Sequence, residues 1–325
     1  MHHSPFRSRR SLCATLATAP LAAAFGGRAF AQPAQRPIAL VVPYPPGGST
    51  DLLGRLYAEA MTAKTGEKLV IENRPGGNST IGAAQVAGAA PDGRTLLYGY
   101  GNLLMNQQFL MKEARVHALR DLVPIARTAV ATTALITSAE SPVKDLADFI
   151  ALARRNPGKH SYAYYGELAI VALAAEAGLS LIRVPYKGGG AASLTDIATG
   201  RVDVMYSSVT QAQPMLRAGK IKVLAIFGEQ RSPDFPNVPT VSEVLPKVRS
   251  VDYQVVFAPK GTPKAVVDEL HAKSVQALDA PEVRQRFSER GATVALLNPE
   301  QTRAYMEADL ARIAEVVKTA GIAAE

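Results

Sequence analysis

A short segment near the start of the chain, VVPYPPGGSTD at residues 41–51, combines residue types that could bind an anion. An apolar run leads into three prolines, which fix the backbone φ angle, and two glycines, which let a ligand approach the main chain closely. Ser49, Thr50 and Asp51 are typical of a helix start, where the first N–H groups have no partner within the helix. The segment therefore predicts a cradle of backbone donors for an anion. A capped turn without a ligand is the alternative, and these residues alone do not decide between the two.

Other candidate binding residues follow the ends of later predicted strands. A second glycine-rich turn, RPGGNST at residues 74–80, opens the next predicted helix, and a plain turn is again the alternative. The candidates in the first part of the chain are Tyr44, Pro46, Gly47, Gly48, Ser49, Thr50, Asn78, Tyr100 and Asn102. The candidates in the second part are Tyr164, Tyr165, Gly166, Lys187, Gly188 and Ser207. Small, polar or aromatic residues at so many strand ends indicate a shared binding site more strongly than any one motif does.

Signatures of catalysis are poor. The histidines beyond the first segment are His117, His160 and His271, and none has a partner at metal-ligand spacing. The sequence has no nucleophile elbow, no P-loop and no dinucleotide fingerprint after a strand. Asp203 could be a buried reactive carboxylate, although a turn-end carboxylate with local hydrogen bonds is the simpler interpretation. We expect no catalytic residue, no metal and no cofactor, and therefore no enzyme.

Residues 1–31 have the features of an export signal. A paired-arginine region at Arg9 and Arg10 precedes a modest apolar core, and Ala29-Phe30-Ala31 fits a cleavage site near Ala31. Twin-arginine export is favoured over the Sec route. The only cysteine, Cys13, lies in this segment, so the mature chain would have no disulfide. We expect a periplasmic protein.

Composition excludes several other classes of protein. The chain has 325 residues and a formal charge of +8, which falls to +4 once the four arginines of the signal are removed. The remaining Lys and Arg residues are scattered without a basic stripe, so nucleic acid is not an expected partner. No later apolar run approaches the length of a membrane span.

Short apolar runs alternate with amphipathic segments along the rest of the chain, which indicates parallel sheets covered by helices. Strands are predicted at 38–42, 68–72, 94–99, 161–165, 181–185, 202–206 and 221–227. Residues 125–137 and 251–259 are predicted to be strands that pass between two lobes. This α/β arrangement assigns residues 32–127 and 254–325 to lobe 1 and residues 128–253 to lobe 2. Three helical stretches, 263–279, 281–290 and 299–319, end the chain.

The chain resembles the solute-binding component of tripartite tricarboxylate transporters, the Bug-type receptors. The resemblance rests on VVPYPPGGSTD, IENRPGGNSTIGAAQVAGAAPDGRTLL, VPYKGGGAASLTDIATGRVDVMYSS and APKGTPKAVVDEL, in this order, and spans nearly all of residues 36–322. It implies a type II periplasmic-binding-protein fold with a ligand cleft between two closing lobes. It also implies a small organic acid as ligand, held by the loop at Pro43–Asp51 and a loop of lobe 2, and membrane transporter subunits as partners of a monomer.

The second-lobe loop departs from the family pattern. The run SYAYYGELAIVALAAEAG is shorter than the family's, and Glu167 falls roughly where the family often has histidine. A carboxylate there would repel an anion, so the ligand is smaller, less anionic or carries an amine. The alternative is that Glu167 faces solvent on a first helical turn. Whether this shortened loop still binds a carboxylate is open.

The leading interpretation is therefore a periplasmic receptor that captures a small carboxylate and delivers it to a membrane transporter. A sensor of the same fold that presents its ligand to a membrane kinase is the main alternative. An enzyme acting on a small carboxylate is a third.

Overall fold

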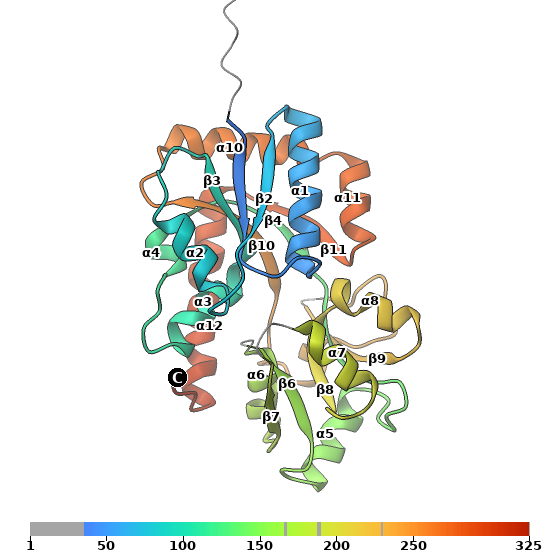
Figure 1. Cartoon of the computed structure of the whole chain (residues 1–325). Coiled ribbons are helices and arrows are strands. Elements are labelled where there is room, and N and C mark those ends of the chain that lie inside the picture. The colour runs from blue at the N-terminus through green and yellow to red at the C-terminus, as the bar shows by residue number, and fades with distance from the viewer. Residues whose placement is uncertain (1–35, 166–167, 187–189, 229, 325) are drawn as a thin grey trace, which may run out of the picture. The chain divides into compact units, whose positions relative to one another are not determined.

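Two β-sheets, each covered by helices, make up the part of the chain that the computed structural model describes: residues 36–165, 168–186, 190–228 and 230–324 (Figure 1). Sheet A has six strands in the order β11-β4-β10-β3-β1-β2, and sheet B has five in the order β7-β6-β8-β5-β9. The predicted α/β class with two lobes is confirmed. We call sheet A with its helices lobe 1 and sheet B with its helices lobe 2.

Sheet A is parallel at one end and antiparallel at the other. Strands β1, β2 and β3 are parallel, whereas β10 runs antiparallel to both β3 and β4, and β11 runs antiparallel to β4. The strand bounds are β1 Ile38–Val42, β2 Leu69–Asn73, β3 Thr95–Tyr100, β4 Leu122–Ala131, β10 Asp252–Pro259 and β11 Ala292–Leu297. The end of β3 therefore lies beside the start of β10, which brings residues distant in sequence to one edge of the sheet.

Sheet B repeats the same plan on a smaller scale. Strand β6 is parallel to β7 and β8, and β5 is antiparallel to β8 and β9. Its strands are β5 Thr133–Ser138, β6 Ser161–Tyr164, β7 Ile182–Pro185, β8 Val204–Ser208 and β9 Ile221–Phe227.

Helices cover the sheets because the strands bury apolar side chains on both faces. In sheet A, Val42 and Val256 pack in the core under α1, whereas Val41 and Val255 pack in the core that includes Met306 of α12. The helices of lobe 1 are α1 Ser49–Thr65, α2 Thr80–Ala87, α3 Gly101–Leu110, α4 Ala118–Asp121, α10 Lys264–Leu278, α11 Pro281–Ser288 and α12 Pro299–Thr319. Those of lobe 2 are α5 Leu146–Arg155, α6 Ala169–Ala177, α7 Gly190–Ala198, α8 Val209–Arg217 and α9 Val241–Val244.

The first passage between the sheets differs from the single strand predicted at 125–137. Strand β4 ends at Ala131 and β5 starts at Thr133, so Thr132 alone separates the two sheets. The Thr132 N–H donates to the carbonyl of Gly291 at 2.9 Å, and the Thr132 carbonyl accepts from the Val209 N–H at 2.8 Å. A Cβ at Gly291 would lie 3.2 Å from the Val209 side chain, so lobe 1 and lobe 2 pack closely there. The lobe boundaries at 127/128 and 253/254 remain predictions.

Four elements were missed in the sequence: α3, β11 and the four-residue helices α4 and α9. Most other elements lie within a few residues of their predicted positions, and Gly66 ends α1 in a left-handed conformation (φ 73°), as its position after the helix indicated. Strand β11 completes the antiparallel edge of sheet A next to β4.

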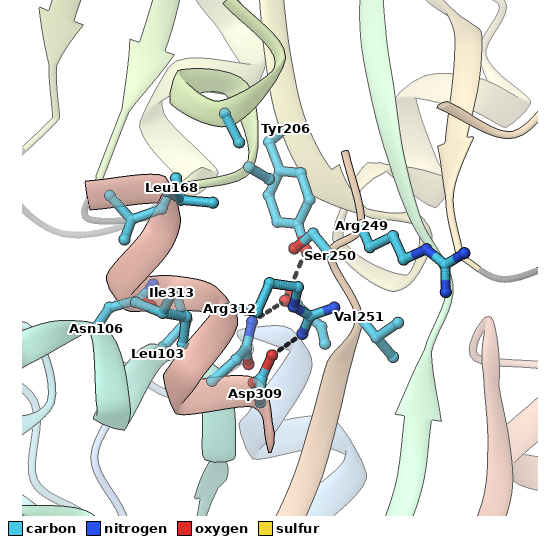
Figure 2. A pocket seen from close by; sticks show the side chains of 15 residues that line it. Leu103, Asn106, Leu168, Tyr206, Arg249, Ser250, Val251, Asp309, Arg312 and Ile313 are labelled. Carbon is cyan, nitrogen blue, oxygen red and sulfur yellow. Dashed lines mark hydrogen bonds and ion pairs between the residues drawn. The ribbon is translucent and has the colours of Figure 1, made fainter. Parts of the chain in front are cut away.

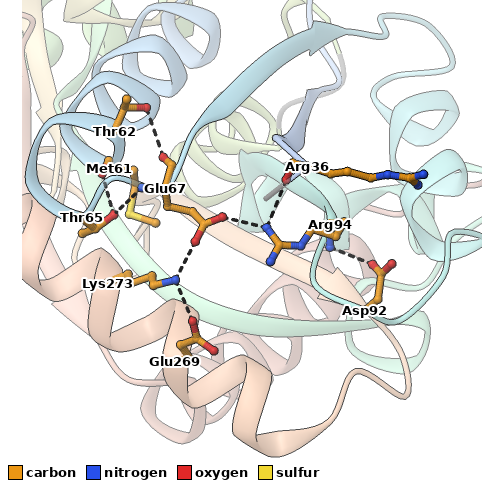
Figure 3. A network of polar contacts seen from close by, with 9 residues as sticks. All are labelled: Arg36, Met61, Thr62, Thr65, Glu67, Asp92, Arg94, Glu269 and Lys273. Carbon is orange, nitrogen blue, oxygen red and sulfur yellow. Dashed lines mark hydrogen bonds and ion pairs between the residues drawn. The ribbon is translucent and has the colours of Figure 1, made fainter. Parts of the chain in front are cut away.

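A buried ion-pair network fixes the start of β2 to its neighbours (Figure 3). Glu67, 5% exposed, accepts from Arg94 Nη1 at 2.8 Å and from Lys273 Nζ at 2.6 Å. Lys273 also pairs with Glu269 on α10 at 2.7 Å. Burial acts to raise the pKa of Glu67, but the hydrogen bonds from Lys273 and Arg94 outweigh it and lower the pKa below 4.5. The network joins α10 and the residues preceding β2 and β3.

We expect Glu67→Gln to lower the free energy of unfolding at pH 7 by about 1–3 kcal/mol, because it leaves two cations without their shared carboxylate. Since the folded-state pKa is lowered, this contribution is present above pH 4.5 and is lost as pH falls through the folded pKa. Urea denaturation at pH 7 and at pH 3 measures both effects. Glu269→Gln, at a side chain that is 62% exposed, is the control and should cost less than about 1 kcal/mol. Equal stability of wild type and Glu67→Gln at pH 7 would contradict the assignment.

Candidate functional site

Backbone donors at the start of α1 form the centre of the candidate site. Gly48 precedes the helix in an extended conformation (φ −72°, ψ 165°), and the Leu52 N–H makes the first helical hydrogen bond to its carbonyl. Among the described residues, the N–H groups of Ser49, Thr50 and Asp51 have no hydrogen-bond partner. Ser49 and Thr50 are only 6% and 2% exposed. Unpaired first-turn donors at the positive end of a helix are suited to an anion.

Asp51 holds the loop before α1 in place. Its carboxylate accepts from the Gly47 N–H at 2.9 Å, from Arg55 at 3.0 Å and from Asn73 Nδ2 at 2.9 Å. Asn73 also donates to the Tyr44 carbonyl at 3.1 Å. Gly47 has φ 79°, a conformation that favours glycine, and its amide points inward rather than toward a ligand. Gly47 is therefore part of the support of the cradle and is not one of its donors.

The pKa of Asp51 reflects this role. Burial acts to raise the pKa, but the hydrogen bonds from Arg55, Gly47 and Asn73 outweigh it, so the pKa lies below the ordinary value of 3.8. The carboxylate is therefore charged at neutral pH and remains the acceptor that orders the loop.

Two tyrosines flank the unpaired amides. The Ser49 hydroxyl lies 2.9 Å from the Tyr100 hydroxyl, and the rings of Tyr44 and Tyr100 meet edge to face with centroids 6.0 Å apart. The Tyr44 hydroxyl is buried, which raises its pKa, and the neighbouring Ser79 side chain opposes that rise. Gln254 pairs with Tyr100 across the antiparallel β3–β10 ladder, so both side chains lie on the same face. Gln254 is fully buried, and neither atom of its amide has a partner in the described part of the chain.

The second glycine-rich turn supports the first loop. Asn78 (φ 49°) and Ser79 (φ 73°) both have left-handed backbones, a conformation uncommon outside glycine and often found at functional positions. A Cβ at Gly82 would come within 2.9 Å of Pro43, so α2 packs directly against the first loop there. Asn78 itself is exposed on the turn, and Pro46 is exposed on the first loop.

The predicted residues of lobe 2 are partly described. Tyr164 packs its ring against Arg183, with 5.0 Å from the guanidinium carbon to the ring centre, and the Tyr165 hydroxyl donates to the Tyr206 carbonyl. Ser207 is fully buried in β8, and its hydroxyl bonds to the Ser208 carbonyl at 3.2 Å. The predictions for Gly166, Lys187, Gly188 and Glu167 fall outside the described residues.

A hydrogen-bonded cluster connects the two lobes at the edge of the site. The Asp252 Oδ1 atom accepts from the Tyr206 hydroxyl and from Asn102 Nδ2, both at 2.6 Å. Asn102 was predicted as a binding residue, whereas Asp252, Tyr206 and Gln254 were missed. The signal for two of them was present, because Asp252 and Gln254 interrupt an otherwise apolar strand, VDYQVVFAP.

The cluster borders a cavity of about 40 Å³ between α3, α6, α12 and the segment before β10 (Figure 2). Its walls come from both lobes, since Leu168 and Tyr206 belong to lobe 2 and Ile313 to lobe 1.

The three histidines lie on or beside separate elements. The His160 ring bonds Asp203 at 2.9 Å, and Asp203 also accepts from the Ser161 N–H and hydroxyl. In the described part of the chain no group of His, Cys, Asp or Glu is arranged to hold a metal ion. Likewise, no described helix has the length and apolarity needed to cross a membrane.

Two α/β lobes joined by crossing segments, with unpaired main-chain donors at a strand end, define the class of two-lobed periplasmic binding proteins. The family model of the tripartite tricarboxylate transporter family receptor matches residues 53–322. The chain belongs to this family of solute-binding receptors, as the motifs indicated.

Relatives and solved structures agree with this assignment. The UPF0065 protein in the tcbD-tcbE intergenic region of Pseudomonas sp. (strain P51) is 36% identical over 272 residues, 82% of this chain and 80% of that protein. The structure of R. palustris Rpa4515 with adipate has a TM-score of 0.84 at 30% identity and covers 90% of this chain and 99% of that chain. The periplasmic binding protein BugD has a TM-score of 0.81 at 30% identity, with the same coverage.

We expect Asp51→Ala to lower the free energy of unfolding by about 1–3 kcal/mol, because the Gly47 and Asn73 donors lose their shared acceptor. Hydrogen exchange of the Gly47 amide should become faster in this variant. Arg55→Ala is the control, since that side chain is 52% exposed and its ion pair should contribute less than about 1 kcal/mol. Unchanged exchange at Gly47 would show that Asp51 does not order the loop.

Proposed function

We propose that this protein is a periplasmic receptor that binds a small organic acid through its carboxylate and delivers it to a membrane transporter. The observation that carries the proposal is the set of unpaired amides at Ser49, Thr50 and Asp51, beside the Tyr100 hydroxyl, against whose ring Tyr44 packs. Residues 1–31 would direct export and be removed near Ala31. The receptor would act as a monomer without cofactor or catalysis.

Several features support a carboxylate as the bound group. A carboxylate is acceptor-only when ionised, and the first turn of α1 offers donors at the positive end of the helix dipole. In a site from which water is excluded, such charge-assisted hydrogen bonds are stronger than in water. The related structure with adipate, a dicarboxylate, is consistent with this ligand class.

Capture would work by closure of lobe 1, which is built on sheet A, against lobe 2, which is built on sheet B. The two crossing segments, at Thr132 and at the return before β10, would serve as hinges. A ligand favours closure only through contacts that differ between the open and closed forms. Contacts from lobe 1 at α1 and from lobe 2 near Tyr165 and Tyr206 would supply that difference, and the transporter would recognise the closed form.

We expect saturable one-to-one binding of at least one small carboxylate when the purified protein is titrated with mono-, di- and tricarboxylates by isothermal titration calorimetry. A bound acid at about 100 times its Kd should also stabilise the folded chain by about 2.7 kcal/mol in thermal or urea unfolding. Chromatography of the bound acid after incubation provides the control. Conversion of the acid to a product, or no binding across the series, would contradict the proposal.

A proline at the first helical position tests the cradle directly. Ser49→Pro removes one unpaired N–H, and the fold should tolerate it because Gly48 already has the extended backbone that proline requires of its predecessor. We expect the affinity for the best carboxylate to fall roughly 10- to 100-fold, as for loss of a hydrogen bond to a charged group.

Ser49→Ala is the matched control because it keeps the N–H and removes only the hydroxyl that contacts Tyr100. Its effect should be clearly smaller. Equal affinity of both variants and wild type, with unchanged circular dichroism, would place the ligand elsewhere.

A further inference from the structure

Asp252 is a buried carboxylate with neutral hydrogen-bond partners. It is 4% exposed, and its Oδ1 atom accepts both the Tyr206 hydroxyl and Asn102 Nδ2. No described residue donates a hydrogen bond to its second oxygen, Oδ2, and no described cation forms an ion pair with it. A buried charge without a countercharge is costly unless something else compensates it. The carboxylate therefore has one oxygen available for a further donor.

Asn102 adds a second acceptor at the same place. Its Nδ2 group is used by Asp252, whereas its Oδ1 atom is buried and has no partner among the described residues. The residue as a whole is 8% exposed. Asn102 and Asp252 both line the cavity of about 40 Å³. That volume accommodates on the order of three water-sized groups, which is enough for one end of a small ligand.

The arginines around this cavity are engaged or directed elsewhere. Arg312 pairs with Asp309, which also accepts the Tyr253 hydroxyl at 3.0 Å. Figure 2 shows Arg249 pointing away from that pair. The electrostatic character next to Asn102 and Asp252 is thus set by acceptors and a negative charge. A second carboxylate would be repelled there, whereas a protonated amine would be bound.

Asp252 and Asn102, which we call the acceptor pair, lie close to the cradle formed by the first-turn amides of α1, along the edge of sheet A. Tyr100, whose hydroxyl contacts Ser49, is the register partner of Gln254. Asp252 precedes Gln254 by two residues, which is about 7 Å along a strand. Asn102 follows Tyr100 by two residues at the same edge. This separation suits a short ligand with different groups at its two ends.

We propose that the ligand of this receptor is a small acid that also carries a protonated amine, with its carboxylate on the first-turn amides of α1 and its ammonium on Asp252 Oδ2 and Asn102 Oδ1. This inference rests on the proposed function, because it assigns the second end of the same ligand. An amine was already one of the ligand features suggested by Glu167, and Asp252 and Asn102 now support it from described residues.

Titration of Asp252 is consistent with this assignment. Burial raises the pKa of Asp252 to about 6, opposed by the hydrogen bonds from Tyr206 and Asn102. Below that pH the carboxyl is protonated and its attraction for an ammonium is lost. The other charged groups at the cavity are Arg249, Arg312 and Asp309. The affinity for an amine-bearing acid should therefore fall as pH decreases from 7.5 to 5.5, whereas that for a dicarboxylate should not.

Calorimetry with a matched series tests the proposal. The probes 4-aminobutanoate, glutarate and butanoate share a carboxylate and differ at the other end, which is an ammonium, a carboxylate or a methyl group. A shorter set, 3-aminopropanoate, succinate and propanoate, allows for a different span. We expect the aminated acid of one set to bind at least about tenfold more tightly than its two counterparts.

Asp252→Asn should lower the affinity for the aminated acid by about tenfold or more. The affinity for the dicarboxylate should stay the same or increase. Asp203→Asn is the matched control, because Asp203 is a partly buried carboxylate in lobe 2 that bonds His160 and Ser161, outside the cavity. It should leave the preference unchanged. Where Asp252→Asn fails to fold, the pH series on the wild type gives the same comparison.

The possible failures are distinguishable. If dicarboxylates bind as tightly as aminated acids, and this binding is weakened by Ser49→Pro, the amine assignment is wrong and the receptor function stands. The same holds if Asp252→Asn leaves the preference for the amine unchanged. If no probe of either set binds but another carboxylate of the wider series does, the amine assignment is wrong and the receptor function stands. If no acid of the wider series or of these two sets binds to the wild-type protein, both proposals fail.

Discussion

The architecture of the candidate site depends on one buried carboxylate. Asp51, in the first turn of α1, accepts hydrogen bonds from the loop that precedes this helix. By accepting from Gly47, Arg55 and Asn73, it fixes the path of the chain from β1 into α1. The amides that follow are thereby held at the helix start with nothing inside the protein to satisfy them. In the proposed site, the Asp51 carboxylate orders the loop, and the donors that it leaves unpaired would bind the carboxylate of the ligand.

The two proposals describe two ends of one binding surface. At one end, main-chain donors, the Ser49 hydroxyl and two tyrosines favour negative charge. At the other, Asp252 and Asn102 present acceptors, and Tyr206 connects them to lobe 2. Since Tyr206 and Asp252 come from different lobes, a group bound at Asp252 would contact a residue whose position depends on closure. Recognition of the ligand's second end and lobe closure would then be coupled through one hydrogen bond.

The sequence was sufficient for the fold and for the cradle but not for the acceptor pair. Periodicity and helix-start residues located β1, α1 and most later elements because these signals act over a few residues. Helix α3 and strand β11 were missed, since their segments lack a clear period and are fixed by packing against β10 and β4. Asp252 could not be interpreted, because its partners Tyr206 and Asn102 lie 46 and 150 residues away. The inward direction of the Gly47 amide likewise depends on a side-chain rotamer that composition does not reveal.

The link between the lobes at Thr132 is made by its own N–H and C=O groups, which bond Gly291 and Val209. A connection built from main-chain atoms is insensitive to which side chain stands at that position. Relatives of this chain could therefore differ in the residues at the strand ends, and so in the ligand that they bind. The main-chain connection between the lobes would stay the same. In such a fold, ligand specificity can evolve independently of the hinge.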